Sequence, residues 1–127
     1  MGTRGQVCVR GKDGDVYLYR HYDAKDLLSD VHVALSFKQR WDDSEYMARM
    51  IFEQMISGNT DKVYGFGISA IKHSDIDLLL IVDCVTQNVI IEKKPLEIKI
   101  AFDQYIKTQV SDMIVFPSQE STSSLPG

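Results

Sequence analysis

Two short polar clusters contain the residue types that could do chemistry in this chain of 127 residues. His21 and Asp23 lie two residues apart, and His73, Asp75 and Asp77 repeat the same spacing. Residues two apart on a β-strand project from one face, so each cluster can present its side chains together. His21 and Asp23 could share a ligand. The carboxylates Asp75 and Asp77 suit Mg²⁺ or Mn²⁺ with waters completing the coordination.

These residues define an enzymatic alternative for the chain. In a metal-dependent phosphoester hydrolase, Asp75 and Asp77 would bind the ion. His21 or His73 would act as general acid or base, and Arg4 would neutralise the phosphate. This mechanism requires the side chains to converge in space. A purely structural interpretation stays open for both clusters. The first would form the turn into the following helix, and the second would be the polar residues at the start of a strand.

The second cluster belongs to a longer segment that resembles the active-site motif of the minimal nucleotidyltransferases. In that family a Gly-Ser turn precedes Asp-x-Asp on a strand, and here GFGIS at 65–69 precedes DID at 75–77. The resemblance implies nucleotidyl transfer with metal-binding carboxylates. It is incomplete, because Ile68 follows Gly67 where the family has Ser or Gly. The third carboxylate of the family also needs more chain than the short turn after Asp83 provides.

A second resemblance covers about the first 85 to 95 residues. The chain opens with MGTRG, continues with LYRHYD at 18–23, and later has GFGIS at 65–69 and HSDIDL at 73–78. It resembles a family of small proteins of prokaryotes and their phages that begin Met-Gly-Thr-Arg and have no established activity. Here AKD at 24–26 replaces a Gly-Tyr-Pro segment, Ser74 replaces a Gly, and Asp77-Leu78 replaces Glu-Tyr. The resemblance implies a fold unit and a phage or mobile-element origin.

Composition narrows the classes of protein that fit. Lys and Arg total 14 against 18 Asp and Glu, a formal charge of −4, and the basic residues are dispersed, which argues against general nucleic-acid binding. No stretch approaches the roughly 18 apolar residues of a membrane span, and MGTRGQVCVR lacks the apolar core of a signal peptide. We therefore expect no membrane contact and a cytoplasmic location. Cys8 and Cys84 fit buried apolar side chains better than a disulfide.

The first half of the chain predicts a hairpin and two helices. Strands at 6–10 and 16–21 flank a five-residue loop that contains Asp-Gly, a hairpin signal. Apolar residues at helical spacing follow Asp26 up to about Trp41. A second helix begins with a capping box at Asp42 and Glu45 and ends before Gly58.

The second half predicts mainly strands. Residues 62–70, 76–84 and 88–92 read as strands, and the last two are antiparallel neighbours because only a few residues join them. After Pro95 we expect a strand and then a short helix, and the Ser-rich residues 117–127 predict a disordered tail. The expected fold is a single α+β domain over residues 1–116, a mostly antiparallel sheet with two main helices packed on one face.

Two functions follow as hypotheses. The first is a small non-catalytic interaction or regulatory protein that acts through a homo-oligomer, most simply a symmetric dimer, or through a host protein. The second is the hydrolase or nucleotidyltransferase-like enzyme that uses Asp75 and Asp77, and only this one needs Mg²⁺ or Mn²⁺. If the first hairpin lies beside the later strands, both polar clusters can meet at one edge of the sheet.

Overall fold

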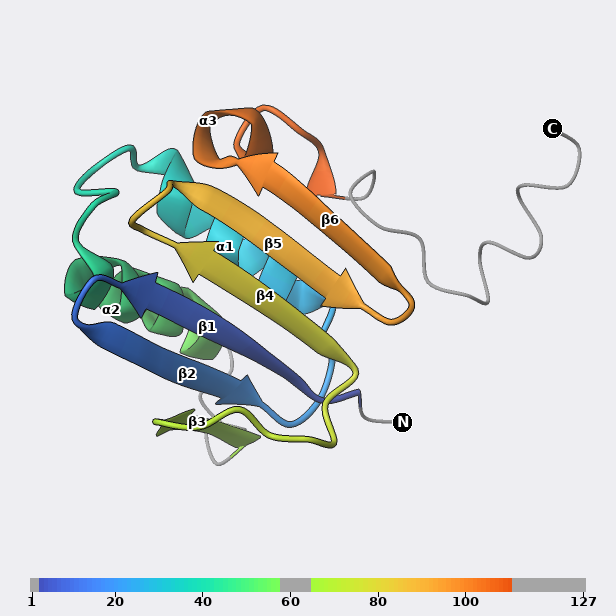
Figure 1. The fold of residues 1–127 in the computed structure, drawn as a ribbon. Helices are drawn as coiled ribbons and strands as arrows, with labels where there is room; N and C mark the ends of the chain where they lie inside the picture. Colours follow the sequence, from blue (N-terminus) through green and yellow to red (C-terminus); the bar gives the residue numbers. More distant parts are fainter. Residues whose placement is uncertain (1–2, 58–64, 111–127) are drawn as a thin grey trace, which may run out of the picture.

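A six-stranded sheet forms the centre of the computed structural model, which describes residues 3–57 and 65–110 (Figure 1). The strand order is β3-β2-β1-β4-β5-β6, and every neighbouring pair is antiparallel except the parallel pair β1 and β4. The expected α+β fold with a mostly antiparallel sheet is confirmed. The strands are β1 (Gly5–Gly11), β2 (Gly14–Arg20), β3 (Phe66–Ser69), β4 (Leu78–Asp83), β5 (Asn88–Lys93) and β6 (Leu96–Ala101).

The helices are α1 (Asp26–Ser36), α2 (Ser44–Ile56) and the short α3 (Phe102–Tyr105). The predicted extension of the first helix to Trp41 is wrong, because Lys38 and Arg40 adopt positive φ angles of 56° and 52° that a helix cannot accommodate. Trp41 nevertheless packs against the core, and its indole Nε1 donates to the Leu35 carbonyl at 3.1 Å. Trp41 lies in a connecting turn, and its position in the sequence fits the helical spacing of apolar residues by coincidence.

The start of α2 is shifted by one residue from the predicted cap. Asp43, and not Asp42, is the N-cap, and its Oδ1 accepts a hydrogen bond from the Tyr46 backbone N–H at 3.1 Å. Such a bond satisfies one of the free N–H groups in the first turn of a helix. The helix then continues to Ile56 on the predicted apolar pattern.

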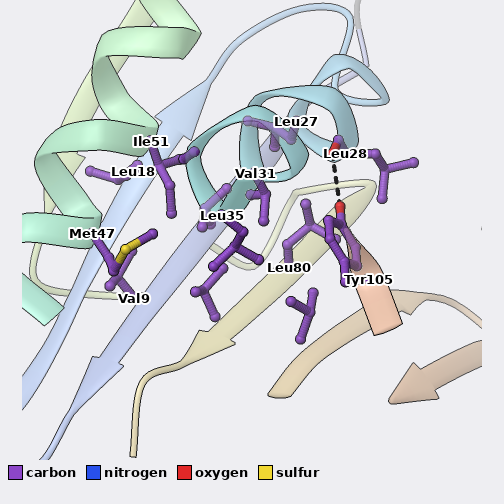
Figure 2. Packing of buried hydrophobic residues seen from close by; sticks show 14 of the residues in the cluster. Val9, Leu18, Leu27, Leu28, Val31, Leu35, Met47, Ile51, Leu80 and Tyr105 are labelled. Carbon is purple, nitrogen blue, oxygen red and sulfur yellow. Dashed lines mark hydrogen bonds between the residues drawn. The ribbon is translucent and has the colours of Figure 1, made fainter. Parts of the chain in front are cut away.

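The main core lies between the two long helices and one face of the sheet. Alternate residues of the central strands, such as Val7, Val9 and Leu80, join the buried residues of α1 and α2 in one cluster (Figure 2). In Figure 1 both helices lie behind the sheet. Tyr105 of α3 closes the far side of this cluster, and its hydroxyl donates to the Leu28 carbonyl at 2.8 Å.

The opposite side of the sheet, called here the second face, carries a smaller apolar cluster. Cys8, Leu79 and Ile81 are buried there, with Tyr17, Ile76 and Ile90 packed around them. The pairing register aligns Tyr17, Cys8, Ile81 and Ile90 across four adjacent strands. Strand periodicity therefore sends alternate residues of these strands to two different apolar layers.

Several predicted strand ends differ from the structure. The second strand ends at Arg20 and not at His21, and the strand predicted from Ile76 begins at Leu78. The third strand covers Phe66–Ser69, while residues 62–64 of its predicted range lie outside the described residues. The strand and short helix expected after Pro95 are confirmed by β6 and α3. The predicted tail, 117–127, and the end of the predicted domain, 111–116, also lie outside the described residues.

Candidate functional site

The parallel pairing of β1 with β4 brings Arg4 to both predicted metal ligands. Gly5 pairs with Leu78, so the residues that precede the two strands are neighbours. The Arg4 backbone N–H donates to Asp77 Oδ2 at 2.8 Å, and the Arg4 carbonyl accepts from the Asp77 N–H at 2.6 Å. The Arg4 Nη1 lies 2.7 Å from Asp75 Oδ2. Arg4 therefore meets two carboxylates that lie 71 and 73 residues away in the sequence, at an end of the sheet that we call the β1/β4 entrance.

The contacts with Arg4 give both carboxylates a structural role. The Arg4 and Asp75 side chains are 42% and 59% exposed, so water screens their ion pair and it contributes little to stability. Asp75 and Asp77 precede β4 in an irregular segment, so the prediction that they line one strand face with His73 is wrong. Among residues 3–57 and 65–110, no group of three or more His, Cys, Asp or Glu side chains is placed to hold a metal ion.

Tyr19 lies between the two predicted imidazoles. The rings of Tyr19 and His73 are stacked, with centroids 4.8 Å apart and planes inclined by 20°. The Tyr19 hydroxyl lies 2.9 Å from His21 Nδ1, within hydrogen-bond distance. Burial raises the pKa of Tyr19, an effect that Arg4 opposes. The two histidines therefore gather around one neutral phenol, next to the β1/β4 entrance.

Asp23 lies where the alternative interpretation placed it, in the turn into the following helix, and not on a strand face with His21. Because β2 ends at Arg20, His21 and Asp23 do not share a strand face. Asp23 has φ 52°, and its carbonyl accepts from the Asp26 N–H at 2.9 Å at the start of α1. The next residue, Ala24, donates its N–H to Thr3 Oγ1 at 2.9 Å. The structure therefore places Asp23 in the turn that leads into α1.

Gln6 positions His73, and sequence reasoning missed it. Its side chain is fully buried, although Gln is usually exposed. The Gln6 Nε2 donates to the Ile71 carbonyl at 3.2 Å, and its Oε1 accepts from the His73 N–H at 2.8 Å. These two bonds hold the 71–73 segment against the second face and so set the His73 ring on Tyr19. A single Gln in a strand gives no sequence signal for this long-range contact.

A second polar group that sequence reasoning missed joins β2 to α1. Arg20 is 3% exposed, and its guanidinium lies 3.2 Å from Asp26 Oδ2 and 3.3 Å from Asp30 Oδ2. Its Nε donates to the Tyr22 carbonyl at 2.7 Å, and its Cζ lies 5.2 Å from the Phe66 ring centroid. The arrangement satisfies a buried cation on several sides, as burial of a charge requires. It therefore reads as a structural ion cluster.

A pocket of about 470 Å³ opens beside the β1/β4 entrance. The segment before β4, the beginning of β4 and the end of β5 supply its walls. Its basic side chains come from both sides, while apolar residues form part of its surface. The lining residues are Lys72, His73, Ser74, Ile76, Asp77, Leu78, Leu79, Glu92, Lys93 and Lys94.

The segment that resembles the nucleotidyltransferase motif takes a different local structure. Gly67 and Ser69 belong to β3, paired with Tyr19 and Tyr17, and do not form a turn. Comparisons of this chain with protein-family models, with curated proteins and with solved structures found no match. The geometry of the described residues therefore carries the functional argument.

Proposed function

We propose that this chain is a non-catalytic interaction protein of the cytoplasm that acts as a homodimer, joined through β6. The observation that carries the proposal is the edge strand itself. In the described part of the chain β6 has a neighbour, β5, on one side only, and its residues Leu96, Glu97 and Lys99 are exposed. An edge strand offers unpaired N–H and C=O groups that a second copy can bind.

Antiparallel self-pairing of β6 has few possible registers. Facing residues must point to the same side of the sheet. One residue of β6 therefore faces its own copy, and the two-fold axis passes between the two. If Ile98 is that residue, Glu97 faces Lys99 of the second copy, and Lys99 faces Glu97. If Glu97 or Lys99 is that residue, two like charges face each other, which is unfavourable. The Ile98 register is therefore the one that matches charge.

The same register improves the environment of Glu97 inside one chain. Glu97 pairs with Glu92 across β5 and β6, so two carboxylates lie directly opposite each other. Like charges in this position destabilise a sheet. In the dimer, Lys99 of the second copy would lie on the free side of Glu97 and reduce this repulsion.

Apolar side chains add to the interface on the other side of the strand. Leu96 is 46% exposed, and Ile98 and Ile100 are half-buried. All three lie on the helix side of the sheet, because they alternate with Glu97 and Lys99. In the Ile98 register, Leu96 would pack against Ile100 of the second copy, and this would occur twice by symmetry. Burial of apolar surface would then accompany the strand hydrogen bonds.

Charge exchange tests this interface. Sedimentation equilibrium should give twice the chain mass for the native protein, and Lys99→Glu or Glu97→Lys should give the monomer mass. The double variant Glu97→Lys/Lys99→Glu should restore the dimer, because it inverts both pairs and keeps them complementary. Circular dichroism checks that each variant folds.

Two results would overturn the proposal. One is a monomeric native protein at every concentration tested. The other is a dimer that both single variants leave intact, since the copies would then meet through another surface. Lys12→Glu is the matched control, because Lys12 lies in the β1–β2 turn and carries the same change of charge. It should remain dimeric.

The enzymatic alternative has weaker support from the site. Both carboxylates on which it depends, Asp75 and Asp77, already bind Arg4. The ring of His73 is stacked on Tyr19, and the hydrogen bond from His73 to Gln6 is made by the His73 backbone N–H. The interaction function needs no reacting group. A host protein remains a further partner in this proposal. The proposed cytoplasmic location is consistent with the free, buried Cys8 and Cys84, since reduced thiols are usual in the cytoplasm.

A further inference from the structure

The pocket beside the β1/β4 entrance differs in charge from the rest of the molecule. The whole chain has a formal charge of −4. Yet the pocket is lined by Lys72, Lys94 and His73, against Asp77 and Glu92, while Lys93 contributes to the lining but pairs with Leu96 and so alternates to the helix side of the sheet. Asp77 already accepts the Arg4 N–H, which places part of its charge in an internal contact. At the pocket the two carboxylates therefore do not outnumber the two lysines, whereas acidic residues outnumber basic ones in the chain as a whole.

The lysine residues of the lining come from two separate segments. Lys72 precedes β4, and Lys93 and Lys94 lie where β5 meets the turn to β6. Within residues 3–57 and 65–110, Lys72 and Lys94 make no ion pair. Both residues line the same pocket, so an anion bound there would interact with both ammonium groups.

The other walls define the rest of the ligand. Leu79 belongs to the apolar cluster of the second face, and Ile76 packs against that cluster. Both residues line the pocket. The volume of about 470 Å³ lies within the range of small-molecule sites. An ammonium group is a compact point charge and binds phosphate without the planar geometry that a guanidinium demands.

We propose that this pocket binds an organic phosphate of mononucleotide size, with Lys72 and Lys94 at the phosphate and Ile76 and Leu79 against the organic part. The site is one of binding, and no bond is made or broken. It shares no residue with the proposed β6 contact, because neither Glu97 nor Lys99 lines the pocket, although Glu97 pairs with the lining residue Glu92. The ligand and the second copy can therefore be tested separately.

Nuclear magnetic resonance titration of the full chain at low ionic strength tests the site. The probes are adenosine monophosphate, adenosine and inorganic phosphate. We expect adenosine monophosphate to shift the amide signals of residues 72–79 and 92–94, and to bind more tightly than either of the other two probes. Added salt should weaken binding, because screening reduces the attraction of exposed charges.

A charge-matched pair of variants assigns the effect to the pocket. Lys72→Gln/Lys94→Gln should weaken binding of adenosine monophosphate about tenfold, which corresponds to about 1.4 kcal/mol. Lys12→Gln/Lys107→Gln removes the same charge from two exposed positions that do not line the pocket, and it should leave the affinity within about twofold. Gln keeps most of each side-chain stem, so the fold should tolerate both variants.

Three outcomes would overturn the assignment. The first is no shift with adenosine monophosphate. The second is equal weakening by both double variants, which would show attraction to net charge alone. The third is equal binding of inorganic phosphate, which would show that the apolar wall contributes nothing.

Discussion

Asp30 combines a buried carboxylate with a buried cation beside it. Its side chain is 15% exposed, and Oδ2 lies 3.3 Å from Arg20 Nη1. Burial raises the pKa of Asp30 to about 6, and this effect outweighs the opposing influence of Arg20, while Asp26 raises it further. Burial raises the pKa of Tyr105, in the adjoining part of the core, and the charge of Asp30 raises it further. Asp30 is thus ionised at neutral pH at a cost in stability.

That cost predicts a pH dependence of folding. In the unfolded chain an Asp has a pKa of about 3.9, so between about pH 4 and pH 6 the folded protein binds the extra proton. The contribution of Asp30 to the free energy of unfolding is therefore greatest below about pH 4 and falls as pH rises to about 6, by at most about 3 kcal/mol. Asp30→Asn should remove this fall.

Urea unfolding of both proteins across this pH range measures the difference. Asp13→Asn is the control, because Asp13 lies exposed in the β1–β2 turn and should keep the native pH dependence. An Asp30→Asn variant with an unchanged slope would show that Asp30 titrates normally.

Both cysteines should be unreactive in the folded protein. Cys8 and Cys84 are 1% and 3% exposed. Burial raises the pKa of Cys84 to about 12, helped by the nearby Asp83, and burial also raises the pKa of Cys8. Because the thiolate is the reactive form, a thiol reagent should label neither residue in native buffer and both in denaturant. Mass spectrometry of the treated protein measures the labelling, and a label on either cysteine in native buffer would contradict this expectation.

At the scale of elements, local signals predicted most of the fold. The Asp-Gly signal correctly predicted the first hairpin, although its turn is residues 12–13 and not the five residues 11–15, and the short connection after Asp83 correctly predicted the antiparallel pair β4 and β5. The end of α1 was not predictable, because Trp41 packs on the same core from a connecting turn. Apolar spacing records which side chains are buried, and a residue can be buried without belonging to the helix.

The candidate site was predictable only in its parts. Arg4, Asp75 and Asp77 were chosen for their residue types, but their contact depends on the parallel pairing of β1 with β4. No local pattern specifies a pairing between strands so far apart in sequence. Gln6 shows the same limit, since its partners lie 65 and 67 residues away. Long-range pairing decided which of the polar residues meet.

One long-range hydrogen bond joins the short helix α3 to α1, in addition to the packing of Tyr105 in the core. The Tyr105 hydroxyl is fully buried and donates to the Leu28 carbonyl (Figure 2). Tyr105→Phe keeps the ring and removes the donor, so it should lower the free energy of unfolding by about 1 kcal/mol. Tyr46→Phe is the control, because that ring contacts Arg40 and Arg49 through its face and should be nearly neutral. Urea unfolding of the three proteins measures both effects, and equal losses would contradict a special role for the Tyr105 hydroxyl.

At the scale of the whole molecule, both proposals depend on local charges in a chain whose net charge is negative. An acidic chain of charge −4 must bring two copies together against net repulsion. The proposed β6 register places Glu97 of each copy opposite Lys99 of the other, so the attraction is concentrated at the contact. Repulsion between whole molecules is spread over longer distances, where salt screens it. Moderate salt should therefore affect the dimer less than it affects ligand binding at Lys72 and Lys94.

A dimer of this kind must link folding to protein concentration. Because a second copy binds the folded chain and not the unfolded one, mass action raises the thermal midpoint as concentration rises. Calorimetry over a wide concentration range should show this rise for the native protein. Lys99→Glu should abolish it while leaving the midpoint of the dilute protein nearly unchanged, because Lys99 is exposed on β6. A concentration dependence that persists in Lys99→Glu would place self-association on another surface, and restoration of the dependence in Glu97→Lys/Lys99→Glu would identify the facing charge pairs as its cause.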